Sequence, residues 1–131
     1  MTLAEILKAK GYSVTQPRRA VFDTLDRFGA LSCSELANKN SGIDRATVYR
    51  TVELFEELGV IHRIWLGFKS KVELSEMFNP HHHHFFCVEC GQAYEIEDSD
   101  LENVLRQIAT SSGHDLKEHS VELKGVCSKC H

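Results

Sequence analysis

Four cysteines arranged as two CxxC pairs are the strongest chemical signal in this sequence of 131 residues. Cys87 and Cys90 form one pair, and Cys127 and Cys130 form the other. One CxxC turn supplies two thiolates at neighbouring corners of a zinc tetrahedron, and a second turn completes the site. Redox-active thiols and simply buried thiols are the alternatives, although a redox motif usually needs only one CxxC. In a sequence without a secretory signal, the pattern predicts structural Zn²⁺ and not a disulfide framework.

Four consecutive histidines, residues 81–84, precede the first cysteine pair almost directly. Successive side chains on a β-strand point to opposite faces. A strand that begins here places His81 and His83 on one face, and His82 and His84 on the other. Each pair then needs partners from elsewhere in the chain to reach the about three to six ligands of a metal site. We therefore expect two further metal sites beside the cysteine site.

The elements that must position these residues change in character near Pro80, where we expect a hinge. Before it, helix signals include the N-cap residues Thr15, Ser32 and Asp44, and Gly29 as a helix end. In the helix that follows Thr15, the apolar face is expected to comprise Ala20, Val21, Leu25 and Phe28. The expected helices span residues 3–9, 16–28, 33–37 and 45–58, and two expected strands span residues 60–66 and 69–75, joined through Gly67. This order of helices followed by a hairpin predicts a winged helix-turn-helix.

Beyond Pro80 the pattern predicts strands at residues 81–88, 93–97 and 119–125, and a helix between the last two. Asp98 or Ser99 can cap this helix, and Gly113 ends it. Its expected buried face consists of Leu101, Val104, Leu105 and Ile108. The second half is thus a small α/β unit within an α+β protein. Its core is modest, so zinc and dimerisation would both help it to fold.

The expected helix at residues 45–58 has the features of a DNA-reading helix. Its basic residues lie in the N-terminal part, which faces base edges in helix-turn-helix proteins, and its acidic residues come later. Arginine can bind phosphate or guanine, and a tyrosine ring can touch a thymine methyl group. An amphipathic helix with a solvated charged face is the alternative. The residues expected at DNA are Arg45, Thr47, Tyr49 and Arg50 on this helix, and Lys69 and Lys71 on the following hairpin.

Composition and charge agree with a DNA-binding first half. Hydrophobic residues make up 42% of the chain and charged residues 26%, as in an ordinary globular protein. No apolar run approaches the roughly 20 residues of a membrane helix, and the N-terminus lacks a signal-peptide core, so we expect a cytoplasmic protein without a membrane contact. The net charge is +1 over residues 1–79 and −5 over residues 80–131, which favours the first half for nucleic acid.

Three stretches together closely resemble the ferric uptake regulator family of metal-responsive repressors. They are RATVYRTVELFEELGVI, the HHHH segment followed by CxxCG, and the C-terminal CxxC. The resemblance covers nearly the whole chain. It implies a winged-helix DNA-binding domain over residues 1–78 and a metal-binding dimerisation domain over residues 79–131. It also implies repression of AT-rich inverted-repeat operators by a homodimer when a regulatory divalent metal is bound.

The resemblance also implies partners for each histidine pair. The family's inter-strand site takes two residues of the histidine segment, a helix glutamate and a later histidine, which match His81, His83, Glu102 and His119 here. The family's sensory site adds ligands from the wing and from just after CxxCG. The matching set is His62, Glu73, His82, His84 and Glu95.

The sequence departs from the family pattern at the sensory site. Iron and peroxide sensors take a histidine from the loop before the third helix, where this chain has Ala30, and His62 offers a substitute. Glu76 is an alternative to Glu73. Ligands dominated by histidine suit tetrahedral zinc, whereas Glu95 as a fifth ligand would also suit Fe²⁺ or Mn²⁺. We favour zinc as the regulatory metal, with Fe²⁺ as the main alternative.

Two other functions compete with repression. A zinc hydrolase needs an open metal position and a general base, but the sequence has no HExxH motif. A zinc store or metallochaperone would explain the histidines but not the winged-helix half. Outside the sites, Cys33 is expected to be a core thiol, and His114 and His131 are expected at the surface.

Overall fold

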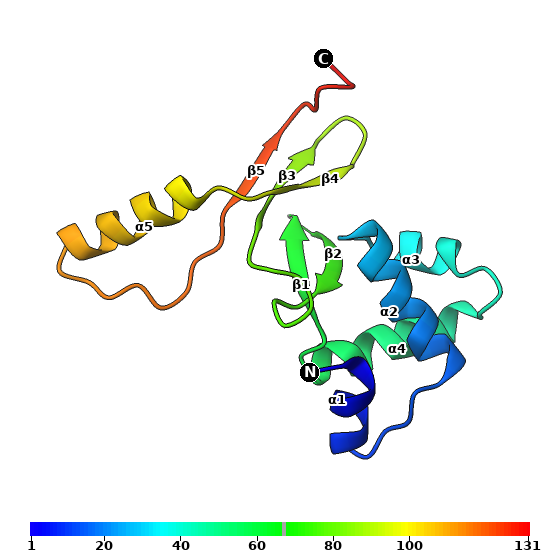
Figure 1. The fold of residues 1–131 in the computed structure, drawn as a ribbon. Coiled ribbons are helices and arrows are strands. Elements are labelled where there is room, and N and C mark those ends of the chain that lie inside the picture. Colours follow the sequence, from blue (N-terminus) through cyan, green and yellow to red (C-terminus); the bar gives the residue numbers. More distant parts are fainter. Residues whose placement is uncertain (67) are drawn as a thin grey trace. The chain divides into compact units, whose positions relative to one another are not determined.

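The computed structural model describes residues 1–66 and 68–131, so the expected hairpin turn at Gly67 lies outside the described residues. The chain divides into two compact units, Met1–Pro80 and His81–His131. The first unit holds α1 (Leu3–Ala9), α2 (Gln16–Phe28), α3 (Cys33–Lys39), α4 (Arg45–Glu57), β1 (Ile61–Leu66) and β2 (Lys69–Leu74). The second holds β3 (His83–Cys87), β4 (Ala93–Ile96), α5 (Ser99–Ser111) and β5 (Glu122–Gly125), as Figure 1 shows.

The helices of the first unit begin where their capping residues predict. Thr15 accepts a hydrogen bond from the backbone N–H of Arg18, and Asp44 accepts one from the N–H of Thr47. Ser32 and Glu35 form a reciprocal capping box at the start of α3. Gly29 caps the end of α2 with a φ of 77°, a conformation that favours glycine. The expected caps are therefore confirmed.

One apolar core lies among α1 to α4 and the base of the β1–β2 hairpin. Val21 and Leu25 of α2 and Phe55 of α4 are almost fully buried. The expectation for Phe28 was wrong, because 46% of its surface is exposed. It lies at the last turn of α2, where the Lys39 ammonium is 4.0 Å from its ring centre. The ring therefore contacts a cation and is not buried in the apolar core.

The hairpin is antiparallel, with Ile61 opposite Leu74 and Leu66 opposite Lys69. Leu31 adds a short pairing that the sequence did not reveal: its N–H donates to the carbonyl of Val72, and the N–H of Val72 donates back. This bridge ties the α2–α3 connection to the hairpin. Helices α2 to α4 followed by this hairpin form the expected winged helix-turn-helix.

The second unit is a three-stranded sheet with the order β4-β3-β5 and the helix α5. β3 is antiparallel to β4 and parallel to β5. The expected strand at residues 81–88 is shorter, because β3 begins only at His83. Asp98 caps α5, as one of the two expected alternatives.

The expected buried face of α5 was wrong for this chain alone. No residue of α5 is buried, and Val104 and Ile108 are 49% and 61% exposed. The physical reason is that no strand of its own unit packs extensively on the helix, which extends away from the sheet in Figure 1. None of the helices in residues 1–66 and 68–131 is long and apolar enough to span a membrane.

Candidate metal centres and nucleic-acid surface

The four predicted cysteines come together at the end of β3. Parallel pairing of β3 with β5 places the two CxxC turns side by side, with the N–H of Val88 donating to the carbonyl of Gly125 at 2.8 Å. The four Sγ atoms lie within 4.8 Å of one another, and those of Cys90 and Cys127 are 3.8 Å apart. Zinc–sulfur bonds of about 2.3 Å give a tetrahedral edge of about 3.8 Å, so the donor set fits Zn²⁺.

Backbone hydrogen bonds favour the thiolate form of Cys87, which is the form that binds a metal. The N–H groups of Cys127 and Cys90 both donate to the Sγ atom of Cys87 at 3.4 Å. They lower the pKa of the Cys87 thiol from 9.0 to about 6. Hydrogen bonding to the neighbouring Cys127 thiolate, together with burial, raises the pKa of Cys130 to about 12. Without a cation, four adjacent thiols cannot all ionise, because the thiolate charges repel one another. A bound Zn²⁺ would offset this repulsion.

Tyr94 is a residue of this site that the sequence analysis missed. It lies on β4, and its hydrogen bond with Cys127 lowers the pKa of that thiol while raising the pKa of the phenol to about 12. No local pattern marks Tyr94, because its position depends on the β3–β4 register. His131 is exposed, as expected, and also lies near this site, since its Nδ1 atom is 2.8 Å from the carbonyl oxygen of Cys127.

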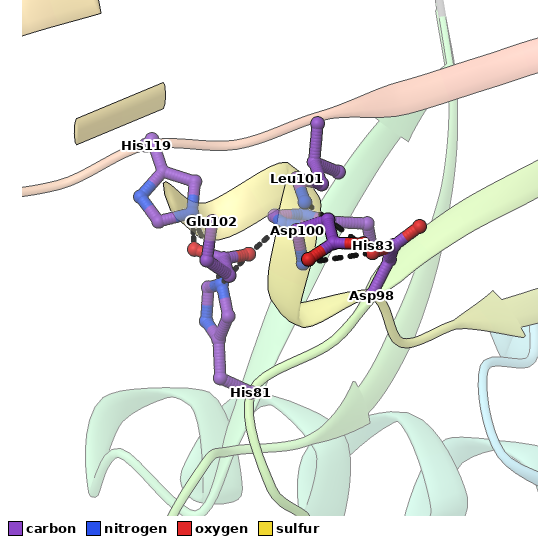
Figure 2. Close-up of polar contacts among 7 residues, drawn as sticks. All are labelled: His81, His83, Asp98, Asp100, Leu101, Glu102 and His119. Atoms are coloured by element: carbon purple, nitrogen blue, oxygen red, sulfur yellow. Dashed lines mark hydrogen bonds and ion pairs between the residues drawn. The ribbon is translucent and has the colours of Figure 1, made fainter. Parts of the chain in front are cut away.

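His81, His83, Glu102 and His119 form a second cluster, in which all candidate ligand atoms lie within 4.8 Å of one another. Figure 2 shows three imidazole rings directed at the carboxylate of Glu102, which α5 supplies from its first turn. One carboxylate oxygen lies 2.5 Å from Nε2 of His83, and the other lies 2.6 Å from Nε2 of His119. The structure therefore brings together the four residues that were matched to the family's inter-strand site.

The imidazoles of this cluster change the pKa of its carboxylate. Burial raises the pKa of Glu102, but the hydrogen bond from His83 and the nearby imidazoles outweigh it and leave the pKa below its ordinary value. The Nε2 atoms of His81 and His119 are only 3.1 Å apart. Two imidazole nitrogens at this distance need a proton or a metal ion between their lone pairs. Three nitrogens and a carboxylate suit Zn²⁺ or another divalent transition metal.

The other histidine pair has similar geometry. The Nε2 atoms of His82 and His84 are 3.2 Å apart, and the side chain of His82 is only 3% exposed. Glu95 lies directly opposite His84 in the β3–β4 pairing, with a carboxylate oxygen 3.9 Å from Nε2 of His82. These three residues form a partial donor set within the second unit. Although His81 and His82 precede β3, the odd and even histidines still separate as strand alternation predicts.

The wing holds the remaining predicted donors as a pair. His62 and Glu73 face each other across the hairpin, with Nε2 of His62 2.8 Å from the Glu73 carboxylate. Glu73 is 2% exposed, which is unusual for a carboxylate, whereas the alternative Glu76 is exposed. Ala30 is buried and offers no donor. The geometry therefore favours Glu73 over Glu76 as the wing's contribution to a metal site.

The N-terminal half of α4 presents the expected polar surface. Arg45, Tyr49 and Arg50 are exposed there, and the guanidinium of Arg45 donates to the Tyr49 hydroxyl at 2.9 Å. The Thr47 hydroxyl donates to the Asp44 carboxylate, so it belongs to the helix cap. Arg50 in turn donates to the Thr47 hydroxyl at 3.2 Å. The surface is thus preorganised by local hydrogen bonds.

The two wing lysines differ. Lys69 is exposed, but Lys71 is buried and forms an ion pair with Glu35 at 2.9 Å. Glu35 also caps α3, and the hydrogen bonds from Ser32 and the Lys71 ammonium lower its pKa despite partial burial. Lys71 therefore joins the wing to α3, and we leave it out of the DNA surface. Cys33 is half-buried and packs against the apolar core, as expected of a core thiol.

Known proteins are similar to this chain in both sequence and fold. Residues 9–124 match the sequence profile of the ferric uptake regulator family. The "Ferric uptake regulation protein" of Haemophilus ducreyi is 33% identical over 95% of this chain and 88% of its own length. The crystal structure of the Vibrio cholerae ferric uptake regulator is 34% identical, with a TM-score of 0.80 over 96% of this chain and 100% of that one. A zinc-bound manganese uptake regulator is 31% identical, with a TM-score of 0.79 over 97% and 99% of the two chains.

Proposed function

We propose a specific mechanism for this chain, which belongs to the ferric uptake regulator family and is therefore a metal-responsive transcription regulator and not an enzyme. It acts as a homodimeric repressor that binds inverted-repeat operator DNA when a divalent ion, preferably Zn²⁺, occupies its regulatory site. The operator is chromosomal, so this function implies a cytoplasmic protein. The observation that carries the proposal is the buried His82–His84 pair, whose Nε2 atoms are 3.2 Å apart.

The chemistry of this pair favours a metal ligand role. A neutral imidazole carries one proton, so two facing Nε2 atoms are satisfied only if one of them is protonated or if a cation lies between them. A divalent ion can bind both lone pairs at once.

The remaining ligands of the regulatory ion are proposed from donor chemistry and from the family resemblance. Glu95 is the nearest acidic group on the neighbouring strand, 3.9 Å from His82. Glu73 is a buried carboxylate already paired with His62, and such pairs are typical of metal-binding shells. In our proposal, His62 and Glu73 of the wing join His82, His84 and Glu95 on one regulatory ion.

Zinc is the proposed signal because the set contains three imidazoles and few oxygens. Fe²⁺ is the second candidate, supported by Glu95 as a fifth ligand and by relatives named ferric uptake regulators. Affinity alone does not separate these metals, because zinc binds most nitrogen and oxygen sites more tightly than Fe²⁺. The free concentration of each metal at which DNA binding begins is therefore the decisive quantity.

The other two clusters have structural roles in this proposal. Cys87, Cys90, Cys127 and Cys130 hold a permanent Zn²⁺ that fixes the two CxxC turns and thereby β3 and β5. His81, His83, Glu102 and His119 bind a further divalent ion that ties the first turn of α5 to the sheet. Both ions would replace packing that the second unit lacks.

Dimerisation follows from the unpartnered apolar surface of the second unit. Val104 and Ile108 on α5 and Leu123 on β5 are about half exposed. β5 is also an edge strand of its sheet. An exposed apolar helix face beside an open sheet edge is stabilised when a second copy covers both. Two copies related by a twofold axis match an inverted-repeat operator.

Repression then requires coupling between metal and DNA. Metal lowers the free energy of the DNA-competent arrangement, and operator DNA must raise the affinity for metal by the same factor. A coupling free energy of about 3 kcal/mol, or roughly 150-fold, would suffice for a switch. Arg45, Tyr49 and Arg50 of α4 read the DNA, and Lys69 contacts its backbone.

The test titrates Zn²⁺, Fe²⁺ and Mn²⁺ separately in buffered solutions and measures binding to operator duplexes by fluorescence anisotropy. The double variant His82→Ala/His84→Ala should lose metal-dependent DNA binding but remain a folded dimer that keeps the cysteine-bound zinc. The matched control is His114→Ala, because His114 is exposed and belongs to none of the three clusters. A double variant that still responds to metal contradicts the proposed regulatory site, and a response to Fe²⁺ only would replace zinc by iron.

A further inference from the structure

The wing carries the two most exposed aromatic side chains in the described part of the chain. Trp65, near the end of β1, is 64% exposed, and Phe68, just before β2, is fully exposed. Aromatic side chains usually cover much of their surface within the core, as Phe55 does on α4. Two neighbouring aromatic residues in water therefore indicate a surface that is covered by a partner.

Polar contacts hold this surface in place. Arg63 lies on the same side of the hairpin, with its guanidinium 5.9 Å from the ring centre of Trp65. The same guanidinium donates to the Ser70 hydroxyl at 2.9 Å and forms two hydrogen bonds with the carboxylate of Glu56 on α4. Arg63 thus lies beside the ring of Trp65 and ties the wing to α4.

Charge favours a polyanionic partner with an apolar component. Lys69 is exposed and directly follows Phe68, whereas Lys71 is buried and forms an ion pair with Glu35. A DNA minor groove offers phosphates at its rims and the apolar faces of sugars and bases within. Proteins that bind there insert apolar side chains between base steps, and aromatic rings can stack on bases of any sequence.

We propose that Trp65 and Phe68 form an apolar wedge in the minor groove of the operator, next to the major-groove segment read by α4, with Lys69 on a flanking phosphate. The proposal rests on the DNA-binding function proposed above and adds a contact to it. A wedge favours steps that open easily, such as TA and CA, so it would contribute specificity without hydrogen bonds to bases.

The experiment uses the full-length, metal-loaded protein and a duplex that it has itself selected from a random pool. Because Trp65 is the only tryptophan of the chain, its fluorescence reports on this surface alone. Binding of the duplex should quench this emission and protect Trp65 from acrylamide. Phe68→Ser and Trp65→Thr should each weaken binding by about tenfold, the range typical of one aromatic–base contact.

Salt dependence separates a wedge from a charge contact. Phe68→Ser should leave the slope of log K against log salt concentration unchanged, whereas Lys69→Ala should reduce its magnitude by about 1. Val14→Ser is the matched control, because Val14 is also an exposed apolar residue of the first unit but lies between α1 and α2, outside the wing. Circular dichroism should show that both wing variants remain folded, since Phe68 has no buried surface to lose.

Three results would overturn the wedge. If the parent protein binds the duplex while Trp65 stays unprotected and both variants bind equally well, the wedge fails but the proposed function stands. If the metal-loaded parent selects no duplex, both fail. If Trp65 emission instead responds to anionic lipid vesicles or to protein concentration without DNA, the surface serves a membrane or a second copy.

Discussion

Each of the two units of this protein is stabilised by a different kind of interaction. In residues 1–80, helices enclose an apolar core in which Leu7, Leu25 and Phe55 are almost fully buried. In residues 81–131, the most buried residues are Phe86, Cys87, Cys127, His83 and His84. The first unit therefore depends on hydrophobic burial, whereas in the second unit candidate metal ligands occupy much of the buried interior.

Most of the candidate metal ligands therefore lie in the unit that has the smaller apolar core. A small unit without a large core gains most of its folding free energy from ions and from a partner subunit. In the proposed function, the stability of such a unit depends on metal concentration. The first unit is instead stabilised by its apolar core, which also holds α4 in place.

The largest expected effect removes the cysteine-bound zinc from the full chain. Cys87→Ser should abolish zinc retention at this site, because a structural site needs all four thiolates. Amide exchange in β3, β4 and β5 should accelerate by at least about a thousandfold, while α2 and α4 remain protected. Mass spectrometry of zinc content and of amide exchange measures both effects. The matched control is Cys33→Ser, which should keep zinc. Slow amide exchange in β3 of a zinc-free Cys87 variant would show that the second unit does not depend on zinc for its stability.

Next in size is a cavity in the helical core. Phe55 is completely buried, so Phe55→Ala should destabilise the first unit by about 3 to 5 kcal/mol. Chemical denaturation followed by circular dichroism measures the loss, and zinc retention should not change. Phe68→Ala is the control, because its exposed ring contributes nothing to the core. If zinc were lost from the Phe55 variant, the two units would not be energetically separate.

A smaller effect is expected at the apolar face of α5. Ile108→Asp should raise the dimer dissociation constant by at least about tenfold, because a carboxylate would be buried in an apolar interface. Analytical ultracentrifugation over a range of protein concentrations measures it, with zinc content as the check on folding. Gln107→Asp adds the same charge at a neighbouring exposed position and should have no such effect. Equal dissociation of the two variants would exclude this face as the interface.

The smallest effect concerns a helix cap in the first unit. Thr15 accepts a hydrogen bond from the N–H of Arg18, so Thr15→Ala should cost about 1 kcal/mol. Thermal unfolding measures this change, and Ser13→Ala in the preceding loop is the control. Metal affinity at all three clusters should remain unchanged. An altered zinc affinity would show that the stability of the helical unit reaches the metal sites.

Much of the fold could be predicted because its signals are local. Thr15, Ser32 and Asp44 cap helices where expected, since capping depends on residues only three positions apart. The two CxxC turns and the separation of odd from even histidines also follow from geometry within a few residues. The family resemblance supplied the distant partners Glu102 and His119, which no local pattern identifies.

Other features depended on contacts that are distant in sequence. Lys71 was expected at DNA because it lies on the wing, but it forms an ion pair with Glu35, which is 36 positions earlier in the sequence. Tyr94 reaches Cys127 only through the register of β4 on β3. The exposed face of α5 has the apolar period of a buried helix, and periodicity does not say whether the same chain or another one covers it.

The sequence by itself determined where the helices begin, the presence of the wing and the kind of donor at each candidate metal site, because these depend on residue type and short spacing. Apart from the family resemblance, only the tertiary structure shows which donors meet. Parallel pairing of β3 with β5 brings the CxxC turns within bonding distance of one ion, and the position of Glu102 on α5 gives His81, His83 and His119 a common carboxylate. Such convergence depends on strand order and register, which local sequence patterns do not encode.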